Sequence, residues 1–171
     1  YIAFERERDL WYYETKNNKM KRVFSFFGDD FLDERTYYDN HAVKVLRMED
    51  NGDLYFIVYG YMNRGVYEGR TGIVLYKYLR ADDRIEEQAY IPVSLPAQFF
   101  EEGISDFSFV STEQFFYFSL YDKIYSYSLI KRKLSVLAEN ISGCSYLALS
   151  ENNHIVWQES IDATKVKKLI I

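Results

Sequence analysis

Few side chains in this sequence could perform catalysis or bind a metal ion. There are two histidines, His41 and His154, and a single cysteine, Cys144. Each histidine falls at the start of an expected strand, and neither accompanies a serine or cysteine in a nucleophile motif such as G-x-S-x-G. A metal site requires clustered histidine, cysteine or carboxylate ligands, which this set does not supply. We therefore predict no catalytic residue, no metal site and no cofactor, and we interpret Cys144 as a small buried apolar residue.

Carboxylates could form two further kinds of site, a calcium site or a catalytic pair for glycoside hydrolysis. Residues 28–34 (GDDFLDE) are acidic enough to bind calcium, but they lack the ligand spacing of a known calcium loop, so an exposed acidic turn is the expected structure. A pair of carboxylates for glycoside hydrolysis, such as Asp106 with an upstream glutamate, depends on contacts in space that one sequence does not reveal.

The strongest candidate for binding is a glycine-rich segment at residues 59–72, which holds four of the eight glycines. Its aromatic, amide and charged side chains offer stacking surfaces and hydrogen-bonding groups suited to a protein or glycan ligand. The glycine spacing matches neither a dinucleotide-binding motif nor a phosphate-binding loop. The alternative is an extended hairpin whose glycines mark bulges. The predicted binding residues are Tyr61, Asn63, Arg64, Tyr67, Glu68 and Arg70.

Composition limits the classes of partner. Hydrophobic residues make up 48% and charged residues 27% of the 171 residues, which is typical of a globular domain. The aromatic share of 19% favours strands, because aromatic side chains suit a pleated, half-buried surface. A net charge of −5 argues against a nucleic-acid partner. No apolar run is long enough to span a bilayer, so we expect no membrane contact by this segment.

A repeat shows which elements must position these residues. Three segments, at residues 10–13 (LWYY), 75–78 (LYKY) and 124–127 (IYSY), share one strand pattern, and each is followed by a basic–apolar pair. A second pattern precedes it: residues 111–118 align with residues 150–157 at an offset of 39 residues. Repeats of about 40 residues with several short strands each are typical of β-propeller blades.

The predicted fold is therefore all-β: a propeller-like arc of about 3.5 four-stranded antiparallel blades, belonging to a larger propeller. We treat residues 1–171 as one propeller segment. It comprises a partial blade at 1–27, blades at 42–91 and 104–141, and a partial blade at 145–171. In the second blade we expect strands at residues 42–48, 54–59, 72–80 and 84–91. The tyrosines of the third strands, such as Tyr125 and Tyr127, are predicted to pack between blades.

Two segments resemble a known family of propeller repeats. Residues 149–157 (LSENNHIVW) look like the S-P-D-G-x-x-I-A-F segment of TolB-like and dipeptidyl-peptidase-IV-N-terminal-like blades. Residues 9–19 (DLWYYETKNNK) resemble the following D-L-W-x-Y-D-L-K-T-G-K strand and turn. The chain departs from the first motif at Glu151 and Asn153, which replace its Pro and Gly. The resemblance implies a propeller and an extracytoplasmic or cell-surface location, but such propellers include scaffolds, protease gates and polysaccharide enzymes.

Interruptions of the repeat point to a functional face. In the second repeat, Phe56 and Leu75 are 19 residues apart, whereas the corresponding residues of two other repeats are 6 apart. The connections at residues 28–40 and 92–103 are longer as well. In an up-and-down blade these three insertions emerge at the same end, where binding loops cluster. We predict a non-enzymatic interaction or ligand-sensing module that binds a protein or glycan there. Alternatives are a carbohydrate-active or peptidase-associated enzyme with catalytic residues elsewhere, and a structural spacer.

Both ends of the sequence read as interrupted strands, so we expect a piece of a longer polypeptide that forms an open arc. The end blades of such an arc would expose apolar sheet faces, which favour self-association. Light scattering of the isolated chain should show dimers or higher species. A well-behaved monomer of high thermal stability would contradict this expectation.

Overall fold

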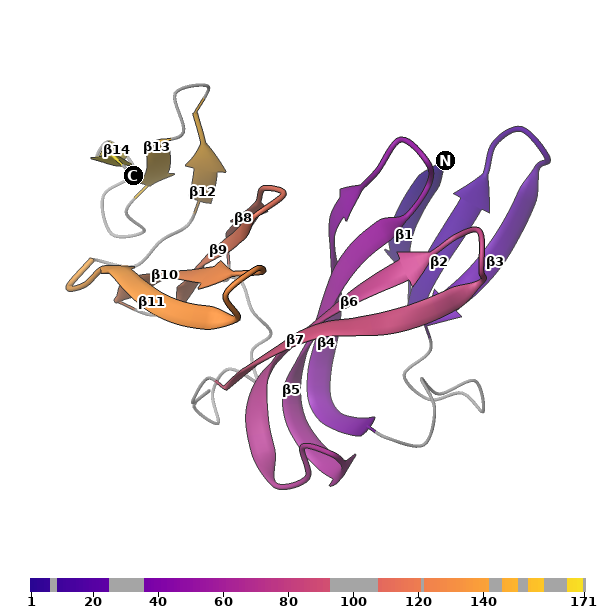
Figure 1. Cartoon of the computed structure of the whole chain (residues 1–171), viewed down its shortest axis with the longest axis horizontal. Coiled ribbons are helices and arrows are strands. Elements are labelled where there is room, and N and C mark those ends of the chain that lie inside the picture. The colour runs from indigo at the N-terminus through magenta and orange to yellow at the C-terminus, as the bar shows by residue number, and fades with distance from the viewer. Residues whose placement is uncertain are drawn as a thin grey trace. The chain divides into compact units, whose positions relative to one another are not determined.

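The computed structural model describes residues 1–6, 9–24, 36–92, 108–120, 122–141, 146–150, 154–158 and 166–170. Every regular element in these ranges is a β-strand, and every strand pair is antiparallel (Figure 1). The chain divides into two compact units, Tyr1–Glu101 and Glu102–Ile171. The predicted all-β fold built from four-stranded antiparallel sheets is therefore confirmed.

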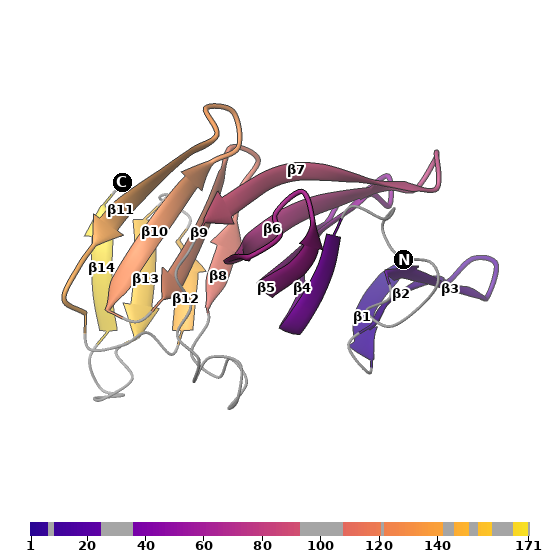
Figure 2. The same cartoon turned by 90° about the horizontal axis from the view of Figure 1, so that it is seen from below.

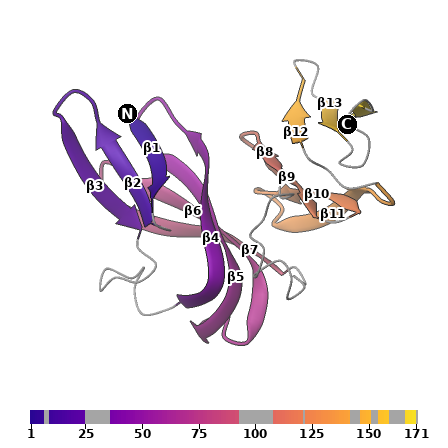
Figure 3. The same ribbon diagram turned by 180° about the vertical axis from the view of Figure 1, so that it is seen from behind.

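The first unit contains two sheets in which consecutive strands are neighbours (Figure 3). One has the order β1-β2-β3 and the other β4-β5-β6-β7. The β2–β3, β4–β5, β5–β6 and β6–β7 connections are short turns that contain Asn, Asp or Gly, residues that accept the backbone angles of a reversal. The strands are β1 (Ile2–Arg6), β2 (Asp9–Glu14), β3 (Lys19–Phe24), β4 (Thr36–Met48), β5 (Leu54–Gly65), β6 (Arg70–Leu79) and β7 (Arg84–Pro92).

The second unit repeats the plan with the sheet orders β11-β10-β9-β8 and β12-β13-β14. Its two sheets pack face to face (Figure 2), with Leu147, Ile155 and Trp157 of one against Tyr117 and Ile124 of the other. The strands are β8 (Phe109–Ser111), β9 (Phe115–Leu120), β10 (Lys123–Ser128), β11 (Lys133–Ala138), β12 (Tyr146–Leu149), β13 (His154–Gln158) and β14 (Val166–Ile170).

The core of the first unit lies between its two sheets. Phe24 of β3 meets Phe56 of β5 with ring centroids 5.8 Å apart, and Phe56 stacks on Tyr76 of β6 at 5.4 Å. Leu10 and Leu54 are fully buried in the same cluster. Each such side chain contributes about 1.5–3 kcal/mol through burial, so this interface holds the two sheets together. In the second unit, Tyr127 is buried, and Tyr125 stacks on Phe118, its direct partner on the neighbouring strand of the same sheet; the packing between blades predicted for these tyrosines stays a prediction.

The tyrosine of the sequence repeat fastens the turn that follows its strand. In the β2–β3 turn the Tyr13 hydroxyl donates to Asn18 Oδ1, and in the β6–β7 turn the Tyr78 hydroxyl donates to Asp83 Oδ1 at 3.1 Å. Asn18 and Asp83 have φ of 52° and 53°, in the left-handed region that Asn and Asp tolerate best among non-glycine residues. The corresponding residue of the β10–β11 turn, Arg132, has φ of 50°.

The β4–β5 turn joins the two sheets of the first unit. Gly52 has φ of 90°, and its amide donates to the Glu49 carbonyl at 2.9 Å. A Cβ at Gly52 would lie 2.5 Å from the Tyr12 hydroxyl and 2.7 Å from Arg80 Cδ. The Tyr12 hydroxyl is buried without a hydrogen-bond partner among the described residues, and burial raises the pKa of Tyr12 to about 12 despite the nearby Arg80. The turn therefore fits only a residue without a side chain.

Gly52→Ala and Gly69→Ala separate backbone strain from steric crowding. Gly69 also has positive φ (76°), but a Cβ added there would have no atom within 4 Å of it. Gly69→Ala should lower the free energy of unfolding by about 1 kcal/mol through strain alone. Gly52→Ala should cost at least about 1 kcal/mol more, because it also crowds Tyr12 and Arg80. Urea denaturation measures the free energy of unfolding of both variants. Equal decreases would show that a side chain at position 52 does not clash with Tyr12.

Candidate functional site

The glycine-rich segment at residues 59–72 is a hairpin rather than a loop. β5 continues to Gly65 and β6 begins at Arg70, with Gly60 opposite Gly72 and Tyr61 opposite Thr71. The expectation that β5 ends at residue 59 and β6 begins at residue 72 is therefore wrong, and the extended hairpin left as the alternative is what forms. The reason is backbone hydrogen bonding: a projecting segment satisfies its amides and carbonyls by continuing the ladder.

Two of the three insertions meet in this extension. β4 begins at Thr36, and its first residues pair with the far end of β5: Thr36 with Gly65, Tyr37 with Arg64 and Asp39 with Tyr61. The insertions that the sequence placed at one end of the strands thus form one three-stranded extension, which we call the hairpin extension (residues 36–39, 59–65 and 66–72; Figure 1). The third insertion lies, after Pro92, outside the described residues.

The tip of the hairpin extension is a tight four-residue turn, Val66 to Gly69. The Gly69 amide donates to the Met62 carbonyl at 2.9 Å, and the Arg70 amide donates to the Tyr67 carbonyl at 3.1 Å. Val66 is 67% exposed, a high value for an aliphatic side chain. Sequence reasoning did not select Val66; the signal was an apolar residue within a turn, where polar residues are usual.

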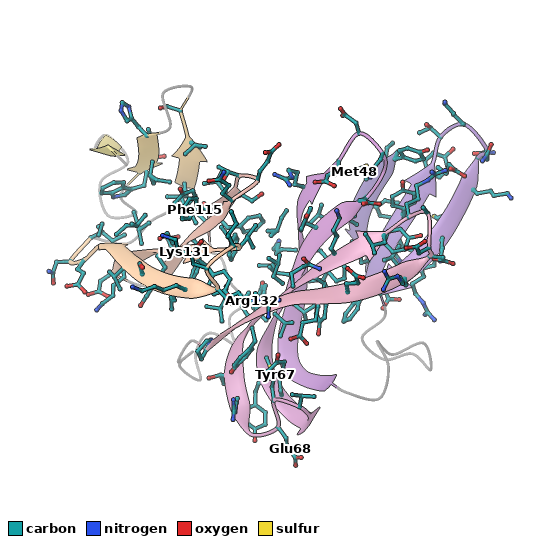
Figure 4. The ribbon with its side chains drawn as sticks, viewed as in Figure 1. Met48, Tyr67, Glu68, Phe115, Lys131 and Arg132 are labelled. Carbon is teal, nitrogen blue, oxygen red and sulfur yellow. The ribbon has the colours of Figure 1, made fainter. Side chains whose placement is uncertain are left out.

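Tyr67 is fixed by its neighbours. Its ring stacks on Tyr90 of β7 with centroids 4.1 Å apart, and its hydroxyl donates to Glu87 Oε1. Tyr90 in turn donates to the Thr71 carbonyl at 2.9 Å. Burial, reinforced by the hydrogen bond to Glu87, raises the pKa of Tyr67 well above its ordinary value, so the hydroxyl remains protonated as a donor. Figure 4 shows Tyr67 and Glu68 at this end of the hairpin.

Tyr61 lies on the opposite face from Tyr67. Consecutive residues of a strand point to opposite faces, and the neighbour Met62 is fully buried in the core cluster against which Tyr67 also packs. Arg70 is paired with Met62 and so shares the Tyr67 face. Tyr61 is 40% exposed on the other face. The hairpin extension therefore presents two faces joined by an exposed tip.

The remaining predicted binding residues occupy the same extension. Glu68 at the tip and Arg70 at the start of β6 are exposed. Asn63 and Arg64 belong to β5, but their side chains are outside the described residues. The six predicted residues are thus close in the fold, distributed over two faces and a tip rather than over one loop.

A second polar group gathers around the β4–β5 turn. Lys77 Nζ lies 3.1 Å from Glu49 Oε2 and 3.2 Å from Asp53 Oδ2. Arg47 pairs with Glu49 at 3.1 Å, and both cations lie 5.0 Å from the centroid of the Tyr55 ring. Asp53 also accepts the Arg80 amide at 3.1 Å. These contacts fix the turn from the face opposite to Tyr12.

The protonation states in this group are firmly set. Burial alone would raise the pKa of Asp53, but hydrogen bonds from the Arg80 amide, Lys77 and Asn51 lower it overall. Burial would lower the pKa of Lys77, but hydrogen bonds to Glu49 and Asp53 raise it well above its usual value. Both side chains therefore stay charged near neutral pH, and neither is suited to exchange protons with a substrate there.

The histidines, the cysteine and the carboxylates considered from the sequence do not form a site among the described residues. His154 is half-buried, and its amide donates to Ser150 Oγ at 3.2 Å. Cys144, Asp106 and the acidic residues 28–34 lie outside the described residues, as does the side chain of His41. Within the described ranges no three His, Cys, Asp or Glu side chains form a group able to hold a metal ion. The same ranges contain no helix with the length and hydropathy to span a membrane.

Comparison with known proteins gives no assignment: no protein-family model matches the chain, and no curated protein matches it. Evidence for function therefore comes from the hairpin extension and the turns.

Alanine substitutions should separate the two tyrosines of the hairpin extension. Tyr67→Ala removes the stack on Tyr90 and the bond to Glu87, and should lower the free energy of unfolding by about 1.5 kcal/mol. Tyr61→Ala removes a partly exposed ring and should change the free energy of unfolding by no more than about 0.5 kcal/mol. Chemical denaturation of the two variants tests this. If Tyr61→Ala is the more destabilising change, Tyr61 is a structural residue and not a contact residue.

Proposed function

We propose that this chain is a non-enzymatic interaction module that binds a partner protein through the hairpin extension. The observation that carries the proposal is Val66, 67% exposed at the tip of a hydrogen-bonded extension, together with Tyr61, 40% exposed farther along the same extension. Exposed apolar and aromatic side chains at a projecting, ordered site are typical of interface anchors. The charges of Glu68, in the tip turn, and Arg70, directly after it, supply polar groups next to Val66.

The rigidity of the tip supports binding. An interface loses affinity when flexible segments must become ordered on association. Here the stack of Tyr67 on Tyr90 and the two backbone hydrogen bonds of the turn fix the tip before any partner arrives. We assign Tyr67 the role of positioning the tip. Tyr61, Val66, Glu68 and Arg70, with Asn63 and Arg64, form the proposed contact group.

We also propose that the sheets are blades of the TolB-like or dipeptidyl-peptidase-IV-N-terminal-like type, part of a larger propeller. In support, the sheets β4–β7 and β8–β11 have the same meander order, and three equivalent turns place a left-handed residue at the same position. The alternative, a segment of a carbohydrate-active or peptidase-associated enzyme, rests on the family resemblance alone. A glycan ligand remains the second candidate, because Tyr61 offers a stacking surface.

Site-directed photocrosslinking tests the contact group. A photoreactive phenylalanine analogue at position 66 should yield a discrete adduct in an extract of the producing cells. The matched control carries the same analogue in place of Met20, a 54% exposed apolar residue of β3. This control should yield no discrete adduct. Adding Tyr61→Ser to the position-66 protein should reduce the adduct by about tenfold or more, because a central anchor is lost.

The melting temperature of each variant must stay near that of the parent, since exposed side chains contribute little to stability. Equal adducts from positions 66 and 20, or none from position 66, would count against a protein contact. A glycan array should be probed in parallel. A signal that Tyr61→Ser abolishes would identify the ligand as a glycan and not a protein.

A further inference from the structure

The β10–β11 turn departs from its two counterparts in the first unit. Asn18 and Asp83 each provide an oxygen that accepts a hydrogen bond from the tyrosine at the end of the preceding strand. Asp83 also forms an ion pair with Lys21. Arg132 occupies the same position and the same left-handed backbone, yet a guanidinium accepts no hydrogen bond. Arginine is less tolerant of this conformation than Asn or Asp, and its electrostatic interaction with Tyr127 replaces the hydrogen bond that the equivalent tyrosines donate in the first unit.

The turn is also strongly basic and carries an exposed apolar side chain. Lys131, Arg132 and Lys133 are consecutive and exposed, and Ile130 beside them is 73% exposed (Figure 4 labels Lys131 and Arg132). Among the described residues no carboxylate forms an ion pair with these three cations; the ion pair of this sheet joins Lys123 to Glu139. A charge cluster of one sign is thus left available in a chain whose net charge is −5.

The turn leads into an edge strand that lacks the charges of its counterparts, although its register shifts between its pairs with Ile124 and Tyr125, as in a β-bulge. β11 is the outermost strand of its sheet, and no described strand pairs with its outer edge. The corresponding edge strands β3 and β7 carry charges along their length, which discourages strand addition. After Lys133, β11 carries none: residues 134–138 read Leu-Ser-Val-Leu-Ala, and Val136 is 43% exposed.

We propose that the β10–β11 turn and the outer edge of β11 form a binding site for an extended acidic segment of a partner protein. The segment adds as a fifth strand along β11 through backbone hydrogen bonds, which is an established mode of peptide recognition. Its carboxylates meet Lys131, Arg132 and Lys133, and an apolar residue covers Ile130. Charge complementarity selects an acidic segment, and the uncharged edge selects an extended one. This site lies in the second unit and is independent of the hairpin extension.

Fluorescence anisotropy with designed peptides tests the proposal on the full chain. The probe is a labelled peptide with a glutamate-rich end followed by alternating valine and threonine. It should bind saturably at low ionic strength, and more weakly as salt increases. A peptide with glutamine in place of glutamate should bind at least about fivefold more weakly. A peptide with alternate backbone amides methylated should lose binding, because it cannot pair with an edge.

Arg132→Asn is the decisive variant. It removes one cation and restores the side-chain acceptor found at Asn18, so the protein should fold at least as well and its melting temperature should hold or rise. Its affinity for the acidic peptide should fall by about fivefold. Lys16→Asn removes an exposed cation from the equivalent turn of the first sheet and should leave the affinity unchanged.

Four results would each overturn the proposal: no binding of the acidic peptide, equal binding of the glutamine peptide, undiminished binding of the methylated peptide, or an equal loss with Lys16→Asn. Tighter binding of single-stranded DNA or of vesicles containing phosphatidylserine would identify the turn as a general anion site instead. A lower melting temperature in Arg132→Asn would show that the arginine has a structural role.

Discussion

The structure depends on a strand that is buried on both of its faces. Along β5, Leu54, Phe56 and Val58 point toward the first sheet, while Ile57 and Tyr59 point the other way, and all five are buried. A single sheet with two apolar faces would expose too much apolar surface to water to be stable by itself. Packing against a second sheet of the same unit is the direct solution for one of these faces, because β1–β3 covers the side of β5 that carries Leu54, Phe56 and Val58.

Within this framework, the turns hold the sheets together. The Glu49–Asp53 turn is fixed on one face by Lys77 and on the other by Tyr12 of the neighbouring sheet, so the position of the turn sets the contact between the sheets. At the opposite end of the same strands, the hairpin extension depends on Tyr67 and Tyr90 in the same way. Aromatic side chains thus serve as local fasteners as well as core residues, which accounts for their abundance in the sequence.

The sequence was informative wherever the structural cause is local. Alternating strands and their repeat predicted the all-β sheets, because these features depend on neighbouring residues. The hairpin extension was read as a loop, since its glycines and charges resemble a loop more than a strand. The opposite faces of Tyr61 and Tyr67 depend on where β5 ends, and the contact of Tyr67 with Glu87 spans 20 residues. Neither can be read from spacing alone.

The contiguity of the two units has a consequence for synthesis. Each unit is a single stretch of chain, and strands pair with their immediate neighbours in sequence. Hairpins form in about 1–10 μs, whereas a ribosome adding about 5–20 residues per second needs seconds to make Glu102–Ile171. All residues that form the described core contacts between the first two sheets have therefore been synthesised when β8 emerges from the ribosome. The order of assembly can follow the order of translation, and the apolar strand β5 is covered within its own unit on the face toward Leu10 before the second unit exists.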